Sequence, residues 1–296
     1  MMNNMENVIY GRNIEKKFKK FKLHIDELKV PKGFATALIG ENGAGKSTLL
    51  NILTGVRVDY KGDIKYFDEQ QALEQEGILD RIGYTGPNNF FLPHWTVSQV
   101  REICSILFDT FSKEKFDAFS KRLNIPEGSQ GVRALSDGNR MKLTLATAFC
   151  RETDLLIMDE PASPLDPLMR DMLCQLIREY LSEGNGEKSV FFSTHNISDM
   201  ENVTDYAIIM DDGSIVEQGF VEELKEKYIL VKGEPEDSER ASKYLIGMSK
   251  GKYGFEGMCL AKDMDKLAGI QVSFETPTLS QISIAVMKQH TGLFQG

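Results

Sequence analysis

The sequence predicts an α/β fold with a parallel sheet at its core, an inserted helical subdomain and a small C-terminal extension. Three observations predict it. Two short apolar strands, at Leu155–Met158 and residues 190–193, are joined by a helical pattern over residues 168–181, and such a β-α-β crossover implies a parallel sheet. A helix-period stretch over residues 96–111 interrupts the strands. Apolar runs on both sides of the turn at residues 211–214 predict a hairpin.

The first part of the chain, up to about residue 85, is expected to consist of strands and turns. Residues 34–39 form a short apolar run, which is typical of a buried strand. A glycine-rich loop follows, and a helix is expected to begin near Lys46. A functional site is therefore expected at the loop that joins this strand to the helix.

The middle of the chain is expected to be mostly helical. Apolar side chains of residues 96–111 recur at three- and four-residue spacing beneath a Thr96 cap, as in an amphipathic helix. Together with residues 115–123 and the segment after Leu135, it suggests a mostly helical insertion between two parts of a sheet-based core. A charged helix is expected after about Val221, and mixed short elements without an identifiable chemical motif follow it.

Composition and charge narrow the class of protein. A chain of 296 residues that is 41% hydrophobic and 27% charged is expected to fold around a core of ordinary globular type. Its net charge of -9 argues against nucleic acid as a partner, because such binding needs a basic face. Four widely spaced cysteines are expected to be reduced structural thiols.

The sequence also bears on location. No apolar run approaches the 18 residues that a membrane helix needs, and the N-terminus lacks the basic and apolar regions of a secretory signal. A cytoplasmic location is therefore expected.

Residues 40–47 read GENGAGKS and fit the phosphate-binding pattern G-x-x-x-x-G-K-[ST] between a predicted strand and a predicted helix. Glycines let successive backbone N–H groups surround a phosphate, and the helix N-terminus adds the positive end of its dipole. Lys46 is expected to contact the β- and γ-phosphates, Ser47 to coordinate Mg²⁺ and Thr48 to support the α-phosphate. The predicted nucleotide-binding residues are Gly40, Glu41, Asn42, Gly43, Ala44, Gly45, Lys46, Ser47 and Thr48.

Two carboxylates and a histidine follow later strands. Asp159 and Glu160 end the apolar run LLIM, which would deliver both to the edge of a nucleotide crevice. Asp159 is expected to bind Mg²⁺, and Glu160 to orient and deprotonate the attacking water as general base. His195 follows another predicted core strand, 35 residues after Glu160, and is expected to sense the γ-phosphate.

With these residues in place the chain resembles the nucleotide-binding domain of ABC transporters over roughly residues 6–230. GENGAGKST looks like the Walker A motif, LLIMDE like Walker B, residues 163–166 like the D-loop and LSDGN at residues 135–139 like the signature motif. The resemblance implies a P-loop NTPase core, in which a RecA-like parallel sheet is joined by an antiparallel β subdomain, and an ATPase that uses ATP and Mg²⁺. It places the nucleotide-binding domain at residues 1–225, its helical subdomain at about 88–150 and an accessory extension at 226–296.

The resemblance also implies a second nucleotide-binding subunit, identical or not, since the family forms head-to-tail dimers with ATP between the Walker loop of one copy and the signature of the other. Ser136 and Gly138 would then donate to the γ-phosphate across the interface. Asp166 of the D-loop belongs to the same implied nucleotide site. Phe18 lies where the family stacks an aromatic ring on adenine, and stacking alone leaves GTP open as a substrate.

This sequence departs from the family pattern at two places. Asp137 replaces a glycine of the signature, which is usually LSGGQ, and Asn139 replaces its glutamine. The charge of Asp137 would slow hydrolysis if it faced the phosphate and would be harmless if it faced solvent. Pro87 stands where a glutamine that binds Mg²⁺ or water is usual, and Asn88 is the candidate replacement.

The resemblance predicts an ATP-driven motor for a separate transmembrane permease, held by it on the inner face of the cell membrane. The aromatic residues Phe90, Phe91 and Trp95 would border the groove for the permease, or would simply pack the helical subdomain. The tail from about residue 221 is similar to extensions of export-type ATPases, which favours an exporter. The alternatives are a soluble ABC-type ATPase with an assembly or regulatory role, and an inactive regulatory subunit with a decayed signature.

Overall fold

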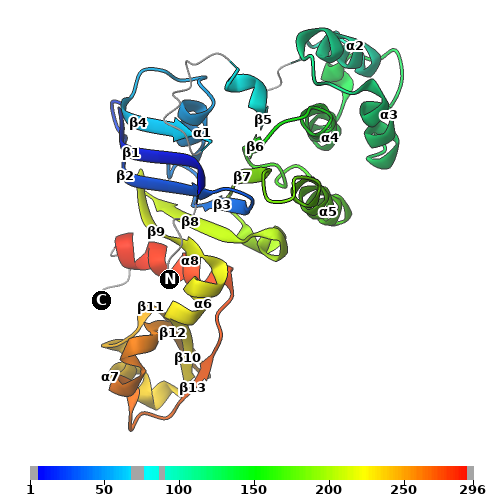
Figure 1. Ribbon diagram of the computed structural model, residues 1–296. Helices are drawn as coiled ribbons and strands as arrows, with labels where there is room; N and C mark the ends of the chain where they lie inside the picture. The colour runs from blue at the N-terminus through cyan, green and yellow to red at the C-terminus, as the bar shows by residue number, and fades with distance from the viewer. Residues whose placement is uncertain (1–5, 68–76, 87–90, 292–296) are drawn as a thin grey trace.

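A six-stranded sheet forms the centre of the protein in a computed structural model that describes residues 6–67, 77–86 and 91–291 (Figure 1). Its strand order is β5-β6-β7-β3-β8-β9, with β9 antiparallel to β8 and the other pairs parallel. The strands are β3 (Ala35–Ile39), β5 (Ile82–Thr85), β6 (Leu155–Met158), β7 (Ser189–Thr194), β8 (Tyr206–Asp211) and β9 (Ser214–Phe220). Every residue of β3, β6 and β7 is buried, as expected for central parallel strands covered on both faces.

A second sheet, antiparallel and three-stranded, has the order β2-β1-β4. It consists of β1 (Asn7–Lys17), β2 (Lys22–Pro31) and β4 (Lys61–Tyr66). Its buried residues share a core with α1 (Lys46–Leu53) and with one face of the central sheet. The phosphate loop, residues 40–47, leads from β3 into α1 and lies against this core.

The middle of the chain forms helices, seen at the upper right of Figure 1. They are α2 (Val97–Leu107), α3 (Lys113–Arg122) and α4 (Asp137–Phe149), and α5 (Pro167–Glu183) follows as the crossover between β6 and β7. Thr96 caps α2, as the sequence predicts, and it forms a capping box with Gln99. However, α2 ends at Leu107, earlier than the predicted residue 111, because Phe108 has the extended backbone angles φ -126 and ψ 110.

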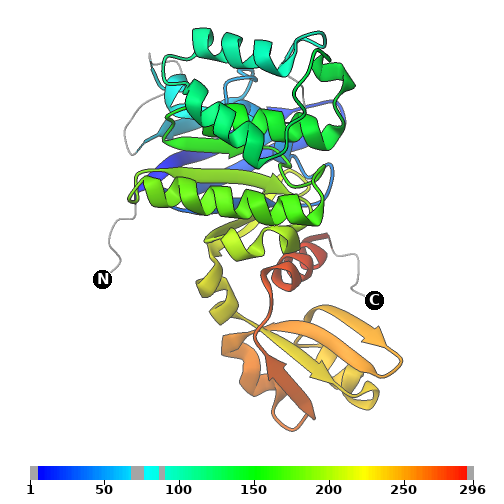
Figure 2. The same ribbon diagram turned by 90° about the vertical axis from the view of Figure 1, so that its right-hand side faces the viewer.

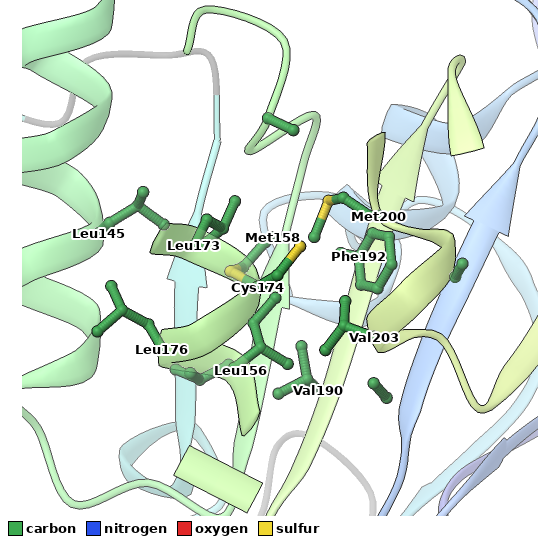
Figure 3. Close-up of a cluster of buried hydrophobic side chains, with 14 of the residues drawn as sticks. Leu145, Leu156, Met158, Leu173, Cys174, Leu176, Val190, Phe192, Met200 and Val203 are labelled. Atoms are coloured by element: carbon green, nitrogen blue, oxygen red, sulfur yellow. The ribbon is translucent and has the colours of Figure 1, made fainter. Parts of the chain in front are cut away.

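The large apolar core lies between the central sheet and the helices that cover it. Figure 3 shows side chains of β6, β7 and α5 meeting there, with Leu156, Phe192 and Cys174 among them. All four cysteines are buried and free. Short 3-10 turns complete this part at η1 (Leu79–Arg81), η2 (Val132–Ala134), η3 (Ile197–Asp199) and η4 (Glu201–Val203).

The C-terminal part forms the accessory sheet, which is antiparallel with the order β11-β12-β10-β13 (Figure 2). It follows α6 (Val221–Lys227) and consists of β10 (Tyr228–Gly233), β11 (Ile246–Gly251), β12 (Gly254–Leu260) and β13 (Val272–Glu275), with η5 (Pro235–Asp237), α7 (Ser238–Ser242) and η6 (Ala261–Leu267) between them. The sequence predicts only mixed short elements here. The last helix, α8 (Leu279–Thr291), returns to the central sheet.

The predicted fold class, an α/β core with parallel and antiparallel sheets, is confirmed. Within the described residues, every helix is too short or too polar to cross a lipid bilayer.

Candidate functional site

The phosphate loop packs against the ends of the neighbouring strands β7 and β8. Gly40 N donates to Thr194 O at the end of β7, at 3.3 Å. A Cβ at Gly40 would lie 2.4 Å from Met210 O, so only glycine fits there. Gly43 and Gly45 both have positive φ, 94 and 105 degrees, which other residues adopt only with strain. The sequence of the loop is thus set by its close packing and its backbone angles.

Lys46 begins α1 and is 5% exposed. Its Nζ donates to Gly40 O at 2.7 Å and to Glu41 O at 3.1 Å, so the ammonium lies across the mouth of the loop. It also lies 3.4 Å from Glu160 Oε1. That contact is an ion pair without hydrogen-bond alignment, since Glu160 Oε1 is buried and has no hydrogen-bond partner. Ser47 and Thr48 follow it on the first turn of α1.

Asp159 and Glu160 stand directly after β6, as predicted, and Ser193 joins them. Asp159 is 2% exposed, and its Oδ1 accepts a 2.5 Å hydrogen bond from Ser193 Oγ. The same Ser193 Oγ accepts from Glu160 N at 2.9 Å. Glu160 has φ 51 degrees, a strained conformation for a residue with a side chain. Ser193 therefore fixes both acidic residues, a role that the sequence analysis missed.

His195 lies beyond the end of β7, where the sequence places it. Its Nδ1 is 2.7 Å from Glu160 Oε2, and its side chain is 43% exposed. Glu160 therefore has one oxygen facing Lys46 and the other facing His195. Within one chain the structure thus brings together the predicted lysine, general base and histidine.

Tyr84 on β5 lies near the carboxylates. Burial raises the pKa of Tyr84 to about 12, and the charge of Asp159 adds to the shift. The phenol consequently stays neutral at physiological pH. A Cβ at the nearby Gly86 would lie 2.6 Å from the Tyr84 hydroxyl, so a larger residue there would have to displace the Tyr84 ring. Asn88, the predicted replacement ligand, and Pro87 lie outside the described residues.

A cavity of about 400 Å³ opens beside these groups. Asn42, Glu160 and His195 line one side, and Asp137 and Arg140 from the start of α4 line another. Its size lies within the range of small-molecule pockets. The cavity therefore joins the sheet edge that carries Glu160 and His195 to the segment that resembles the signature motif.

The signature-like segment forms the N-terminus of α4. Ser136 is its N-cap, and its Oγ accepts from Asn139 N at 3.3 Å. Asp137 is exposed and forms an ion pair with Arg140 one turn later. A Cβ at Gly138 would lie 3.1 Å from Pro164 O of the D-loop. The acid that departs from the family pattern thus has its own cationic partner.

Asp166 ends the D-loop and caps α5. Its Oδ1 accepts from Met169 N at 3.0 Å. Arg170, on the first turn of α5, donates through Nε to Leu165 O at 2.9 Å and pairs with Asp199 at 2.8 Å. These contacts fix the D-loop and give Asp166 a capping role.

Phe18 lies in the turn between β1 and β2 and is 40% exposed. Lys16 and Arg57 stand over its ring, at 5.4 and 5.2 Å from the centroid. A ring at the surface with cations beside it suits stacking on a base and contact with phosphates.

Of the predicted permease-facing aromatics, Phe91 lines a cavity of about 280 Å³ with Tyr84 and Phe108. Trp95 packs half-buried against the large core. Phe90 lies outside the described residues.

A parallel sheet whose edge carries a glycine-rich loop, a buried lysine and two carboxylates defines the class of P-loop nucleoside-triphosphate hydrolases. A family model described as ABC transporter matches residues 23–163. The chain is 30% identical over 226 residues to a probable sulfate/thiosulfate import ATP-binding protein of Chlorella vulgaris, covering 72% of this chain and 92% of the relative. It is 30% identical over 204 residues to Nod factor export ATP-binding protein I of Ralstonia nicotianae, and the match covers 66% of this chain and 61% of the relative.

The fold also matches solved structures. One is the dimeric structure of a post-hydrolysis state of an ATP-binding cassette bound to ADP and Pi, with a TM-score of 0.61, 19% identity, and coverage of 72% of this chain and 98% of that one. The chain belongs to the ABC transporter ATP-binding family. It is an ABC-type ATPase, which confirms the predicted family, ATP binding and enzyme class.

Proposed function

We propose that this chain is the ATP-hydrolysing motor of an ABC transporter and drives a separate membrane permease. One observation carries the proposal: Lys46 and His195 approach the two oxygens of Glu160, at 3.4 and 2.7 Å. A carboxylate held between a phosphate-binding lysine and a histidine stands where water would attack a γ-phosphate.

The proposed roles follow from this geometry. Lys46 and the N–H groups of the phosphate loop hold the β- and γ-phosphates, and Thr48 supports the α-phosphate. Glu160 accepts a proton from the attacking water, and His195 holds Glu160 and contacts the γ-phosphate. Phe18 stacks on the base.

The residues present fit a magnesium ion. Asp159 supplies a buried carboxylate and Ser47 a hydroxyl, which are the oxygen ligands that Mg²⁺ prefers. When bound, the ion would neutralise charge that develops on the phosphates. Ser193 orients Asp159 for this task through its 2.5 Å hydrogen bond.

We propose that hydrolysis needs a second nucleotide-binding subunit, identical or not, whose Ser136 and Gly138 complete the site, with Asp166 near the interface. The similar cassette solved as a dimer with ADP and Pi supports this arrangement. The ion pair of Asp137 with Arg140 supports an active signature, because it offsets the negative charge. Residues 1–225 would form the nucleotide-binding domain, and residues 226–296 an extension whose helix α8 packs on that domain.

We propose that the permease holds the protein at the inner face of the membrane and that the pair works as an exporter. The cavity beside Phe91 supports a docking place on the helical subdomain. The similar proteins include an import protein and an export protein. The proposed direction of transport therefore rests on the tail from residue 221.

ATP turnover of the wild type against Glu160→Gln tests the motor. We expect the variant to retain ATP binding and to lose turnover by about 100-fold or more. Glu152→Gln, an exposed acid upstream of β6, is the matched control and should turn over ATP normally. Equal and negligible turnover by wild type and Glu160→Gln would overturn the enzyme role.

Copurification from detergent-solubilised membranes tests the permease. The wild type should retain a multi-span protein that a Phe91→Asp variant loses while still binding ATP. Reproducible absence of such a partner would overturn the transporter role and leave the soluble ATPase.

A further inference from the structure

Helix α8 links the accessory sheet to the central sheet (Figures 1 and 2). Its apolar side Leu279, Ile282, Ala285 and Val286 is buried in the large core beside the central sheet. On the accessory side, Gly247 of β11 approaches it so closely that a Cβ there would lie 2.8 Å from Ala285 Cα. The helix therefore contacts both sheets.

Both ends of α8 are tied to residues near the ends of central-sheet strands. At its start, Leu279 N donates to Glu201 Oε1 at 2.9 Å. In its last turn, His290 Nδ1 lies 2.9 Å from Asp211 Oδ2. The Asp211 side chain is 12% exposed and that of His290 is 41% exposed. Asp211 opens the hairpin turn, residues 211–214, between β8 and β9.

This hairpin turn is bonded directly to the phosphate loop. Gly213 N donates to Ala44 O at 3.0 Å, and Gly213 O accepts from His24 N at 2.8 Å. Gly213 has φ 78 degrees, and a Cβ there would lie 2.1 Å from Lys22 O. The turn is therefore packed tightly against β2 and joined to the phosphate loop by the Gly213–Ala44 hydrogen bond.

The side chain of Phe21 adds a second connection. Its ring atoms would lie 2.8 Å from a Cβ at Gly45 and 3.2 Å from one at Gly213. The ring therefore packs against both the phosphate loop and the hairpin turn. Met210, the residue before Asp211, likewise lies within 3.1 Å of the Cβ position at Gly45.

We propose that His290 is a positioning residue for ATP binding, which acts through Asp211 and the hairpin turn on the phosphate loop; this rests on the proposed ATP site. The hydrogen bond fixes the carboxylate that begins the turn, and the turn fixes Ala44. A loop held in its binding geometry before ATP arrives spends less of the binding free energy on ordering. Because α8 also contacts β11, the accessory sheet has a physical route to the ATP site.

The dissociation constant for ATP, measured with the full chain, tests the proposal. We expect His290→Ala to raise it roughly fivefold, a size typical of coupling between linked sites, with kcat changed less than twofold. His290→Asn places an amide nitrogen near the position of Nδ1 and should restore the wild-type value within about twofold. Gln289→Ala, exposed on the same turn of α8, should bind as the wild type does.

The thermal midpoint of the ATP-free proteins separates positioning from a general loss of stability. A lower midpoint with unchanged ATP affinity in His290→Ala would overturn the inference, as would failure of His290→Asn to restore affinity. If His290→Ala did not fold, His290→Leu keeps bulk without the donor and carries the same expectation. Absence of ATP binding by the wild type would instead overturn the proposed function itself.

Discussion

The central sheet and the accessory sheet differ in how their strands are buried. Strands β3, β6 and β7 of the central sheet are buried at every residue. In the accessory sheet even the inner strands β10 and β12 keep half-buried or exposed residues, and the edge strands β11 and β13 have no fully buried residue. The edge strand β9 of the central sheet is likewise half-buried throughout, so the contrast concerns the inner strands. The buried core between its elements consists of Val231, Ala241, Phe255, Cys259 and Leu267.

The difference indicates which part of the fold can hold site residues with strained backbone angles and which part can open locally. Glu160, at φ 51 degrees, and the positive-φ glycines of the phosphate loop stand at the ends of the fully buried strands. A small core resists local opening weakly, so the accessory sheet is expected to open first. The following predictions test that contrast, from the largest effect to the smallest.

Lys46→Met should abolish most activity. The change removes the ammonium that faces Gly40 O, Glu41 O and Glu160, and it leaves Glu160 without its nearest cation. We expect ATP turnover to fall by about 100-fold or more, and ATP affinity to fall as well. Steady-state turnover and equilibrium ATP binding measure this. Normal affinity would show that the buried lysine does not meet the phosphates.

Ser193→Ala should reduce turnover by about tenfold with smaller change in ATP affinity, because it frees both Asp159 and Glu160 N. Ser189→Ala is the matched control. Ser189 begins the same strand and its Oγ accepts from Gly33 N at 2.9 Å, far along the strand from the carboxylates. If both variants lost turnover equally, the loss would reflect the strand and not the site.

Arg140→Ala should lower turnover about threefold by leaving Asp137 unpaired near the phosphates. Asp137→Asn in the same chain should recover most of that loss, since the charge to be balanced is gone. Turnover of the wild type, both single variants and the double variant forms the cycle that measures this coupling. Additive effects would show that Asp137 faces away from the nucleotide.

Phe255→Ala should open the accessory sheet while leaving turnover within about twofold of the wild type. The measurement is the rate at which a thiol reagent labels each cysteine near neutral pH. Burial raises the pKa of the Cys259 thiol and of Cys174 in the large core, so the native thiols react slowly.

Faster labelling of Cys259 alone would support the contrast between the sheets. Equal acceleration at Cys174, or loss of turnover, would show that the two sheets open as one unit.

Much of the central sheet could be predicted from the sequence because its signals are local. Buried parallel strands are continuous apolar runs, and the glycines of residues 40–47 follow from backbone angles and close packing. Asp159 and Glu160 come within two residues of the end of β6, and His195 directly follows β7, so the apolar runs alone locate these three residues at the sheet edge. The positions of these residues therefore follow from where the buried strands end.

The accessory sheet escaped prediction because the buried, half-buried and exposed residues of its strands follow no clean period. In β11, for example, three half-buried residues are followed by three exposed ones, and the strand carries a shift in register. Ser193 was missed because a serine at a strand end has no signal of its own. Its role follows only once the pairing of β7 with β6 is known, because the hydrogen bond from Ser193 to Asp159 joins these two parallel strands. The bond between His290 and Asp211 depends on tertiary packing in the same way.

Helix α8 also has a consequence for how the protein is made. Its side chains complete the core beside β8, and its last turn meets Asp211 across 79 residues of chain. A ribosome adds about 5–20 residues each second, so β8 waits several seconds with an apolar face uncovered. Nascent chains of this protein should therefore occupy chaperones until α8 has left the exit tunnel.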